Sequence, residues 1–421
     1  MKFLMYSQSG EGAQILKRIS DEGNDCVLFI KDKVYKSVFD GLLEKTDIPN
    51  PDKDTIVLFD MSGNGQIADG WRRKGHHVFG ASSFADQLEH DRQFGFNIME
   101  QAGIQIPEYK EFTTFKEGLD FVREANKELL VFKPSGSMPT KLTYVSKSSE
   151  ELASYMTFVE KRYGKHIKSF ILQEFIKGTV VSSEAFCMGE KGFRYPFNHT
   201  VEVKKSMNDD LGPSTGCSGN IAWACETDHI TLAGVELVEA ICRKEGYFGQ
   251  IDLNAVVNDS GVYGLEWTPR FGYDSVGTLL SLLEMDFGEL FAGLAKGQLK
   301  EIPLSEDYAG SVRVTIPPYP AEFEKDSESL SPNMGVPILG YEGFEEDVYF
   351  YEVCFEDDVL LHSGGTGVIA CVIGQAGQAD HCLNLAYQSL EEIIIPDKQY
   401  RTDLVDVLSE MVEGVNEYAA S

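Results

Sequence analysis

Short apolar runs alternate with amphipathic stretches at the start of the chain. The runs MKFLMYS, CVLFI, TIVLFD and HHVFGAS have the length and apolar character of buried strands. Between the first two runs, QILKRISDEG carries Ile15, Leu16 and Ile19 at helical spacing. Strands that alternate with helices in this way favour a parallel sheet. We therefore predict an α/β fold with a parallel sheet up to about residue 105.

Beyond this region the pattern changes to a mixture of strands and helices. ELLVFKP, SFILQEFI and VVSSEAFCMG are predicted strands, and SSEELASYMTFVEKR and DHITLAGVELVEAICRKEG are predicted helices. Residues 191–220 are polar and rich in glycine, which predicts a loop region, and residues 278–297 are predicted to be helical. The last part predicts strands at YAGSVRVTIPP, VYFYEV and TGVIACVIGQ, followed by two helices. This order indicates several packed domains of mixed α and β structure.

Two apolar-rich runs within residues 246–272 flank the turn sequence NDSG and predict a β-hairpin. The first run carries Asp252 and Asn254, and the second carries Glu266 and Thr268 followed by Arg270. Because side chains alternate between strand faces, a three-residue loop would place the four oxygen-bearing side chains on one face, whereas a two-residue loop would divide them. Oxygen ligands suit Mg²⁺, and Arg270 lies where it would bind a phosphoryl group. The hairpin therefore indicates nucleoside triphosphate chemistry on a sheet.

Length and charge narrow the class of protein. A chain of 421 residues is too long for one ordinary core, so two to four domains are expected. The net charge of −30 repels nucleic acids and anionic membranes, so we expect neither as a partner, and an anionic substrate must be bound by local cations. The eight cysteines form no C-x-x-C pair, which is typical of reduced thiols in a cytosolic protein. We find no signal peptide and no apolar run of membrane-spanning length, and therefore expect a cytoplasmic protein.

Two glycine turns, SGEG and SGNG, follow predicted strands of the first region. Each would hold a phosphate against the N-terminus of the next helix, or would simply make a tight turn. The pattern alone leaves both interpretations open.

Several motifs, in the same order along the chain, resemble those of one family. FGASSFADQLEHDRQF is similar to its FGPTxxAAxLExSKxF, VFKPSGSMPTKLTYV to its VIKADGLAAGKGV, and LQEFIKG to its IEEFLxG. DLGPSTGCSG resembles DTGPNTGGMG, and LEWTPRFG resembles LEFNxRFG. Nearly end to end, the chain resembles the ATP-grasp superfamily, and within it the glycinamide ribonucleotide synthetase (phosphoribosylamine–glycine ligase) family.

The resemblance implies an ATP-grasp fold with an N-terminal parallel-sheet domain and a C-terminal mixed α+β domain. The implied segments are an N-terminal α/β substrate domain over 1–108, a small lid subdomain over 109–190, a large subdomain over 191–305 and a C-terminal domain over 306–421. The implied activity is that of a C–N ligase of purine biosynthesis, in which ATP, glycine and phosphoribosylamine give glycinamide ribonucleotide, ADP and phosphate. The implied cofactors are ATP and Mg²⁺ or Mn²⁺, and the protein would be a monomer or a homodimer.

The family motifs also imply roles for individual residues. Lys133 and Arg270 match the catalytic phosphate-binding positions. Glu266 matches the family's metal-binding glutamate, Thr268 replaces its partner asparagine, and Asp252 stands where many other ATP-grasp enzymes, though not usually this family, have an acidic residue, so all three are implied metal ligands. The residues implied to bind the nucleotide are Arg92, Lys133, Lys141, Gln173, Glu174, Phe175, Ile176 and, as the ribose carboxylate, Glu184. The residues implied to bind the other substrates are Gly10, Asp210, Gly212, Pro213, Ser214, Thr215, Gly216, Gly219 and Arg270, with Lys204 or Lys205 supplying positive charge.

The chain departs from the family at its N-terminus. The family loop GNGGREH, implied to hold the ribosyl phosphate, is replaced by SQSGEG at residues 7–12, where Glu11 would repel a phosphate. ATP chemistry is therefore expected to be retained, while recognition of the amine is altered. Three hypotheses follow: the family reaction, a related ligase that joins an amino acid to a different amine such as a nucleotide or modified base, and a nucleotide-binding regulator without catalysis. A Rossmann dehydrogenase is disfavoured because no full G-x-G-x-x-G follows the first strand.

Overall fold

A parallel sheet opens the fold, as the alternating pattern predicts. The computed structural model describes residues 1–125, 129–135, 142–320 and 333–420. The first five strands run parallel in the order β3-β2-β1-β4-β5. They are β1 (Lys2–Ser7), β2 (Asp25–Ile30), β3 (Glu44–Lys45), β4 (Thr55–Phe59) and β5 (His77–Phe79), and the helices of this region are α1 (Ala13–Asp21), α2 (Gly65–Arg73), α3 (Ser83–His90) and α4 (Arg92–Ala102). The predicted parallel sheet is confirmed.

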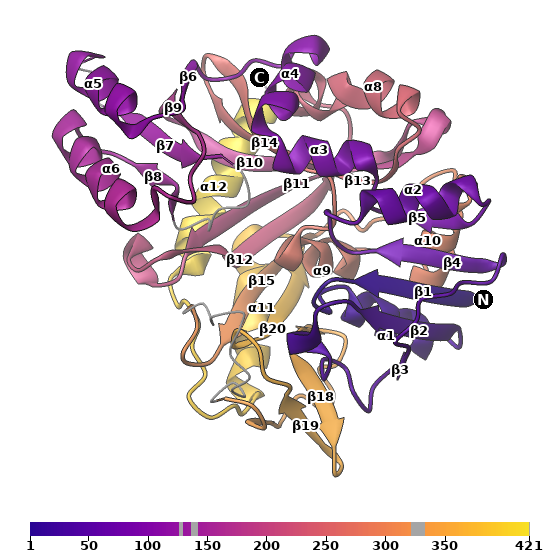
Figure 1. The fold of residues 1–421 in the computed structure, drawn as a ribbon. Helices are drawn as coiled ribbons and strands as arrows, with labels where there is room; N and C mark the ends of the chain where they lie inside the picture. Colours follow the sequence, from indigo (N-terminus) through magenta and orange to yellow (C-terminus); the bar gives the residue numbers. More distant parts are fainter. Residues whose placement is uncertain (126–128, 136–141, 321–332, 421) are drawn as a thin grey trace.

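A small antiparallel sheet with two helices forms the next unit. Its order is β6-β9-β7-β8, from β6 (Tyr109–Phe112), β7 (Leu130–Pro134), β8 (Tyr144–Val145) and β9 (Phe170–Glu174). Helices α5 (Phe115–Ala125) and α6 (Ser149–Tyr163) pack against each other and close its own apolar core, in which Phe112, Phe132 and Phe170 are in ring contact. Figure 1 shows this unit projecting from the rest of the molecule at the upper left.

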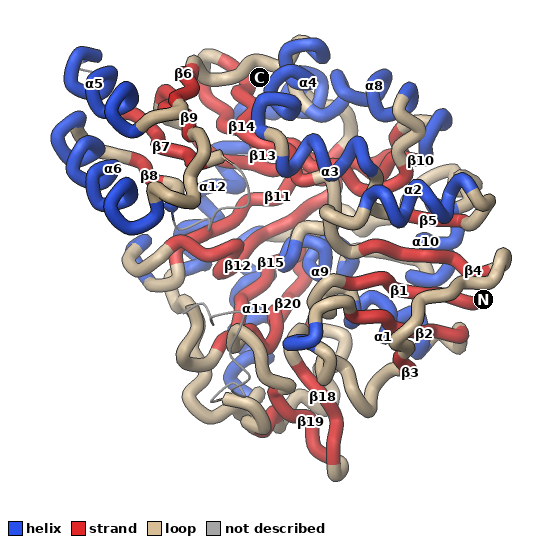
Figure 2. The backbone as a smooth tube through the Cα atoms, viewed as in Figure 1, coloured by secondary structure: helices blue, strands red, loops and turns tan. Residues whose placement is uncertain are grey.

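An eight-stranded sheet occupies the centre of the molecule (Figure 2). Its order is β14-β13-β10-β11-β12-β15-β20-β17. The strands are β10 (Thr179–Met188), β11 (Phe193–Lys205), β12 (Ser214–Cys225), β13 (Phe248–Asn258), β14 (Gly261–Thr268), β15 (Tyr308–Thr315), β17 (Val348–Phe350) and β20 (Val368–Ala376). The sheet therefore takes β10 from the segment predicted as a lid, and β15, β17 and β20 from the segment predicted as a C-terminal domain.

The prediction of a loop region over residues 191–220 is wrong, because most of it forms β11 and β12. The polar composition is misleading here, since Asn198, His199 and Thr200 are buried in β11 and hydrogen-bonded within the protein. Buried polar side chains that find partners are compatible with a central strand. Only the connection between the two strands, around residues 206–213, is a loop.

The remaining helices lie outside the sheets. They are α7 (His229–Ala233), α8 (Glu239–Lys244), α9 (Tyr273–Ser281), α10 (Phe287–Ala295), α11 (Ala379–Glu392) and α12 (Leu404–Ala419). The predicted single helix over 278–297 is thus two helices. The Glu22 carboxylate accepts the amide protons of Phe287 and Gly288 at 2.6 and 2.8 Å, which caps a new helix start from a distant part of the chain.

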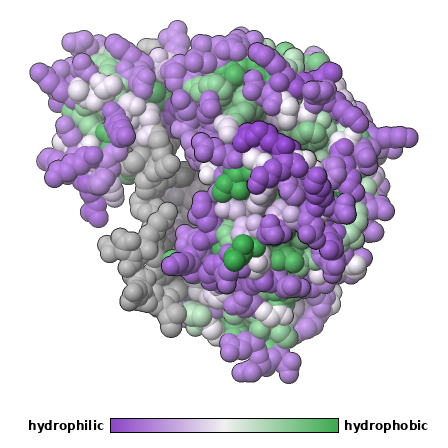
Figure 3. Space-filling view, turned by 45° about the vertical axis from the view of Figure 1, so that its right-hand side comes forward, coloured by the Kyte–Doolittle hydropathy of each residue, from purple (hydrophilic) through white to green (hydrophobic). Residues whose placement is uncertain are grey.

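A three-stranded sheet completes the fold, with the order β16-β19-β18 from β16 (Pro337–Ile338), β18 (Val353–Glu356) and β19 (Val359–His362). Most buried apolar side chains, from the parallel sheet to α12, form one continuous core. The coloured part of the face in Figure 3 is predominantly hydrophilic, with small apolar areas scattered among polar ones. Among the helices of the described residues, none has the length and apolar character needed to cross a membrane.

Candidate active site

The β13–β14 hairpin brings its four oxygen-bearing side chains onto one face, by a route that the sequence did not predict. Asn258 pairs with Gly261, so the loop has two residues, and the register then shifts by one residue between Asn254 and Ala255. This β-bulge restores the alternation that a two-residue loop alone would have broken. Asp252 therefore lies opposite Thr268, and Asn254 lies opposite Glu266.

Four cationic side chains lie within electrostatic reach of the Glu266 carboxylate, which is set among many protein atoms but is still reached by solvent. Burial opposes its ionisation, but the positive charges of Lys204, Lys133, Arg92 and Arg270 hold the pKa of Glu266 below its ordinary value. Lys204 lies in β11, Lys133 near the end of β7, Arg92 at the start of α4 and Arg270 in the turn after β14. The site is therefore built from the eight-stranded sheet, the small antiparallel sheet and a helix of the N-terminal region. Such a convergence of positive charge in an overall acidic protein is suited to a polyphosphate.

Lys133 is the most deeply buried member of this group. Burial lowers its pKa to about 8, against the opposing effect of Glu266 and with the help of Arg92 and Lys204. Arg92 is also mostly enclosed, and its Nε has no hydrogen-bond partner among the described residues. The Arg92 guanidinium therefore has unsatisfied capacity for an anionic ligand.

The hairpin face offers a set of oxygen atoms that fits a magnesium ion. The Asn254 amide donates to Asp252 Oδ2 at 3.0 Å and to Thr268 Oγ1 at 3.3 Å, which fixes three of the side chains relative to one another. Asp252 Oδ1 is buried and has no hydrogen-bond partner within the described part of the chain. A buried carboxylate oxygen without a partner, beside the accessible Glu266, is the donor type that Mg²⁺ prefers.

The segment predicted to bind adenine follows the small sheet. Gln173 and Glu174 end β9, and Phe175 and Ile176 lead into the connection to β10. The Glu174 amide donates to the Glu108 carbonyl at 2.8 Å, while the buried Gln173 Nε2 has no partner among the described residues. The adenine role of this segment stays a prediction.

The other two predicted nucleotide ligands are placed differently. Lys141 lies outside the described residues. Glu184 is fully buried in β10, where it accepts hydrogen bonds from Thr200 and Gln250 on its two oxygens. Burial raises the pKa of Glu184 to about 7. Because both oxygens are engaged within the sheet, this arrangement gives no support to the predicted contact with a ribose.

Next to the cationic group lies a cavity of about 310 Å³. It is lined by Gly10 from the loop after β1 and by residues of the loop before and at the start of β12, namely Pro213, Ser214, Thr215 and Gly216. Segments that are some two hundred residues apart in the sequence thus line one cavity. Tyr273 also lines the cavity, and Arg270 stacks on its ring at 4.6 Å from the centroid.

Four residues predicted to bind substrate do not line this cavity, and one of them, Arg270, lies beside it against Tyr273. The exposed Asp210 is paired with the buried Arg401 at 2.8 Å, and Gly212 is in an exposed turn. Gly219 lies within β12, where a Cβ atom would come within 2.4 Å of the Leu404 side chain. Close packing against α12 explains the glycine at this position.

Arg270 is anchored beside the cavity. Its guanidinium forms an ion pair with Glu89 at 2.8 Å and donates to the Phe271 carbonyl at 2.9 Å. Glu89 and the cavity residues Glu11 and Glu352 were not singled out as binding residues from the sequence. Glutamates far apart in the sequence carry no local signal that they share a site with Arg270.

In the two glycine turns, several of the glycine amide groups are already engaged by carboxylates of the protein. Asp60 Oδ2 accepts the Gly12 amide proton at 2.8 Å, and Asp86 accepts those of Gly63 and Gly65 at 2.6 and 2.8 Å. Internal carboxylates thus take the place of an anion at both turns. The interpretation of these turns as phosphate cradles is not supported by their hydrogen bonding.

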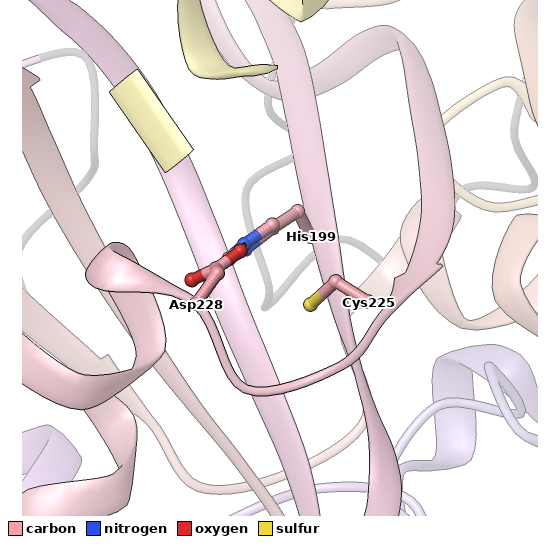
Figure 4. A group of neighbouring side chains, drawn as sticks. All are labelled: His199, Cys225 and Asp228. Carbon is pink, nitrogen blue, oxygen red and sulfur yellow. Dashed lines mark hydrogen bonds and ion pairs between the residues drawn. The ribbon is translucent and has the colours of Figure 1, made fainter. Parts of the chain in front are cut away.

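A separate cluster of His199, Cys225 and Asp228 has donor atoms within 4.8 Å of one another (Figure 4). The His199 ring contacts Asp228 Oδ2 at 2.8 Å and Ser183 at 3.0 Å, so both nitrogens are engaged. Asp228 Oδ1 also caps α7. Burial raises the pKa of the Cys225 thiol, which keeps it protonated. The hydrogen bonds indicate a structural role for this cluster.

Comparisons with known proteins agree with this geometry. Residues 90–273 match the model of the ATP-grasp (A) domain of phosphoribosylglycinamide synthetase. The phosphoribosylamine–glycine ligase of Caldanaerobacter subterraneus subsp. tengcongensis is 27% identical over 393 residues, covering 90% of this chain and 89% of that protein. Its counterpart from Streptococcus pneumoniae is 23% identical over 430 residues, covering 96% of this chain and 99% of that protein.

Two solved structures share the fold over nearly the whole chain. The phosphoribosylamine–glycine ligase of Thermotoga maritima superposes with a TM-score of 0.73 at 20% identity and covers 96% of this chain and 100% of its own. A biotin carboxylase from Campylobacter jejuni, in complex with β-γ-ATP, superposes with a TM-score of 0.65 at 14% identity, covering 99% of this chain and 97% of its own.

Proposed function

Since this chain belongs to the phosphoribosylglycinamide synthetase family of ATP-grasp proteins, we propose that it is a ligase that uses ATP to join a carboxylate to an amine. The reaction named for its relatives supplies the reference case, in which glycine is the carboxylate and phosphoribosylamine is the amine. The observation that carries the proposal is the cluster of Lys133, Lys204, Arg92 and Arg270 around Glu266, next to a cavity of substrate size.

The reaction has two steps. A carboxylate oxygen of the acid takes the γ-phosphoryl group of ATP, which gives an acyl phosphate and ADP. The amine nitrogen then attacks the acyl carbon, so that a C–N bond forms, the C–O bond to phosphate breaks, and inorganic phosphate leaves. Both steps gather negative charge at one place, and the rate therefore depends on positioning and on charge neutralisation by the protein.

The described residues supply these two contributions. Lys133, Arg92 and Lys204 would bind the phosphate oxygens, and Arg270, between them and the cavity, would bind the phosphoryl group as it moves to the acid. Glu266 and Asp252, with Thr268 beside them, would hold a Mg²⁺ ion, whose charge would offset that of the phosphates. Lys133 lies near the end of β7 and is buried, which limits the reorganisation needed to meet a ligand.

The test is a measurement of ADP release that depends on both an amino acid and an amine. The wild type is expected to release ADP only when Mg²⁺, the acid and the amine are all present. Lys133→Met is expected to lower kcat/KM for ATP by about 100-fold or more. Lys161→Met, at an exposed lysine on α6, serves as the matched control and should retain the wild-type rate. If Lys133→Met and Lys161→Met behave alike, or if no amine stimulates ADP release, the proposal is wrong.

A further inference from the structure

The connection between β11 and β12, which we call the 206–213 loop, leads directly into the wall of the cavity. Lys205 pairs with Ser214 across the two strands, at the base of this loop. Ser214 and the next two residues, Thr215 and Gly216, line the cavity. A shift of the 206–213 loop would therefore move this part of the cavity wall.

The backbone of the 206–213 loop has a conformation that needs support from outside. Asp209 and Asp210 have φ values of 57° and 54°, and Gly212 has a φ of 76°. Non-glycine residues rarely adopt a positive φ, and two in succession persist only where other contacts fix them. Both aspartates are exposed, so burial of their side chains in a core does not supply this support.

Arg401, which lies just before α12, makes contacts that support the loop. The residue is 1% exposed. Its Nη1 atom donates to Asp210 Oδ1 at 2.8 Å and to the Lys205 carbonyl at 3.1 Å. Its Nε and Nη2 atoms donate to the two carboxylate oxygens of Asp403 at 2.8 and 2.7 Å. One buried guanidinium thus joins the 206–213 loop to the start of α12, and its planar set of donors is suited to several fixed contacts at once.

The two residues that follow Arg401 contact the same loop. Asp403 Oδ2 accepts the Asp209 amide proton at 2.9 Å. The Asn208 side-chain amide donates to the Thr402 hydroxyl at 2.7 Å, and the Thr402 backbone amide donates to Asn208 Oδ1 at 3.1 Å. Asp403 is at the N-cap of α12 but makes no side-chain cap hydrogen bond there. Its carboxylate therefore serves Arg401 and the loop instead of the helix.

The segment that holds the loop is itself fixed to the rest of the molecule. Gln399 and Thr315 exchange backbone hydrogen bonds at 2.7 and 2.9 Å, which attaches the segment to β15 of the eight-stranded sheet. The Tyr387 hydroxyl, on α11, donates to the Arg401 carbonyl at 2.6 Å. Arg401 thus connects the loop to a firmly held part of the fold.

We propose that Arg401 is a positioning residue of this ligase, which fixes the 206–213 loop and through it holds Ser214, Thr215 and Gly216 in the cavity wall. The proposal rests on the proposed ligase function and adds to it a residue that does not itself line the cavity.

This assignment also changes the role of Asp210. The family motif implies that Asp210 contacts a substrate, whereas its carboxylate is paired with Arg401. Loss of this pair should weaken the binding of a substrate in the cavity. It should leave the binding of ATP unchanged, because ATP would bind at the cations around Glu266.

The experiment measures initial rates of ADP release with Mg²⁺, while ATP, glycine and phosphoribosylamine are varied in turn. Arg401→Lys keeps a charge beside Asp403 but lacks the planar set of donors, and Asp210→Gly removes the carboxylate at a backbone position that suits glycine. Each variant should raise KM for glycine or phosphoribosylamine about tenfold and leave KM for ATP within about twofold of the wild type. A merely structural role would instead lower the amount of active enzyme, and hence the maximal rate, without changing any KM.

Asp209→Gly is the matched control, because it makes the same backbone change one residue earlier and leaves the pair of Arg401 and Asp210 in place. It should keep the wild-type KM values. The double variant Arg401→Lys with Asp210→Gly should have KM values close to those of Arg401→Lys alone, because both substitutions remove one shared contact. Effects that multiply would show that Asp210 binds the substrate directly, and they would overturn the proposal, as would unchanged KM values in both single variants.

Hydrogen–deuterium exchange separates this proposal from the ligase function. In Arg401→Lys the backbone amides of residues 206–216 should exchange at least about tenfold faster than in the wild type, while those of β13 should keep the wild-type rate. Unchanged exchange in the loop would overturn the positioning role while the ligase function stands. If the wild type shows no ADP release that depends on an acid and an amine, the proposed function fails and the positioning role with it, even where exchange responds to Arg401→Lys.

Discussion

Raising the pH from 7 to 9 is expected to lower kcat/KM for ATP about tenfold, because it discharges Lys133. Burial lowers the pKa of this lysine to about 8, although Glu266 opposes the shift. With a pKa of about 8, the charged fraction of Lys133 falls from about 0.9 at pH 7 to about 0.1 at pH 9. Only the charged form attracts a phosphate, and the pH dependence of kcat/KM reports the pKa of the free enzyme. Activity with limiting ATP should therefore fall as the pH rises through 8.

The assay follows initial rates of ADP release at subsaturating ATP and saturating acid and amine, at pH values between 6 and 10. Lys133→Arg is the decisive variant, because a guanidinium stays charged over this range. In Lys133→Arg the decline of kcat/KM for ATP at alkaline pH should be absent, even if the rate of this variant at pH 7 is lower than that of the wild type. Glu11 has a pKa of about 8 as well, so an alkaline limb that persists in Lys133→Arg would assign the titration to another group and refute the reasoning. A profile that is flat from pH 7 to 9 in the wild type would refute it equally.

Three further predictions concern metal binding and stability. Glu266→Gln should raise the Mg²⁺ concentration needed for half-maximal ADP release and lower kcat by about 100-fold or more, because it removes the negative charge at the centre of four cations. An unchanged magnesium dependence would contradict the assignment of Glu266 as a metal ligand. Asp274→Asn should destabilise the protein by about 3–5 kcal/mol in urea unfolding, because it leaves the Arg313 guanidinium buried and unpaired. The double variant that also carries Arg313→Met should recover most of this loss of stability. Gly65→Ala should lower the free energy of unfolding by about 1–3 kcal/mol in the same measurement, because the added Cβ atom would lie 2.1 Å from the Ser82 backbone. Gly70→Ala, on the same helix, should be neutral or stabilising, because the nearest atom to its added Cβ is 3.9 Å away.

Local sequence patterns were sufficient to predict the parallel sheet, and the family motifs supplied the candidate active-site residues. Alternation of apolar runs and amphipathic segments predicted β1, β2, β4 and β5, because strand and helix periods are properties of the chain itself, but it did not predict the two-residue β3. The motif order identified Lys133, Arg92, Glu266 and Arg270, which the fold brings to one place. Their roles as ligands of ATP and metal stay predictions until they are measured.

Features that depend on distant segments were not accessible to that reasoning. The break between α9 and α10 depends on Glu22, which caps the second helix from about 265 positions away. The strand β11 contains polar residues whose partners lie on β10, and it was predicted as loop for that reason. A polar residue in a sequence does not indicate whether the fold provides a buried hydrogen-bond partner for it.

The hairpin and the cavity show which features the sequence alone determines and which depend on the tertiary structure. The sequence determined that Asp252, Asn254, Glu266 and Thr268 alternate along two strands, but the shared face depends on a bulge that offsets a two-residue loop. It likewise determined that glycines occur after β1 and near residue 365. Only the tertiary structure decided that Asp60 and Glu352 take up the amide groups of those loops, because a hydrogen bond is satisfied by whatever acceptor the fold brings within reach.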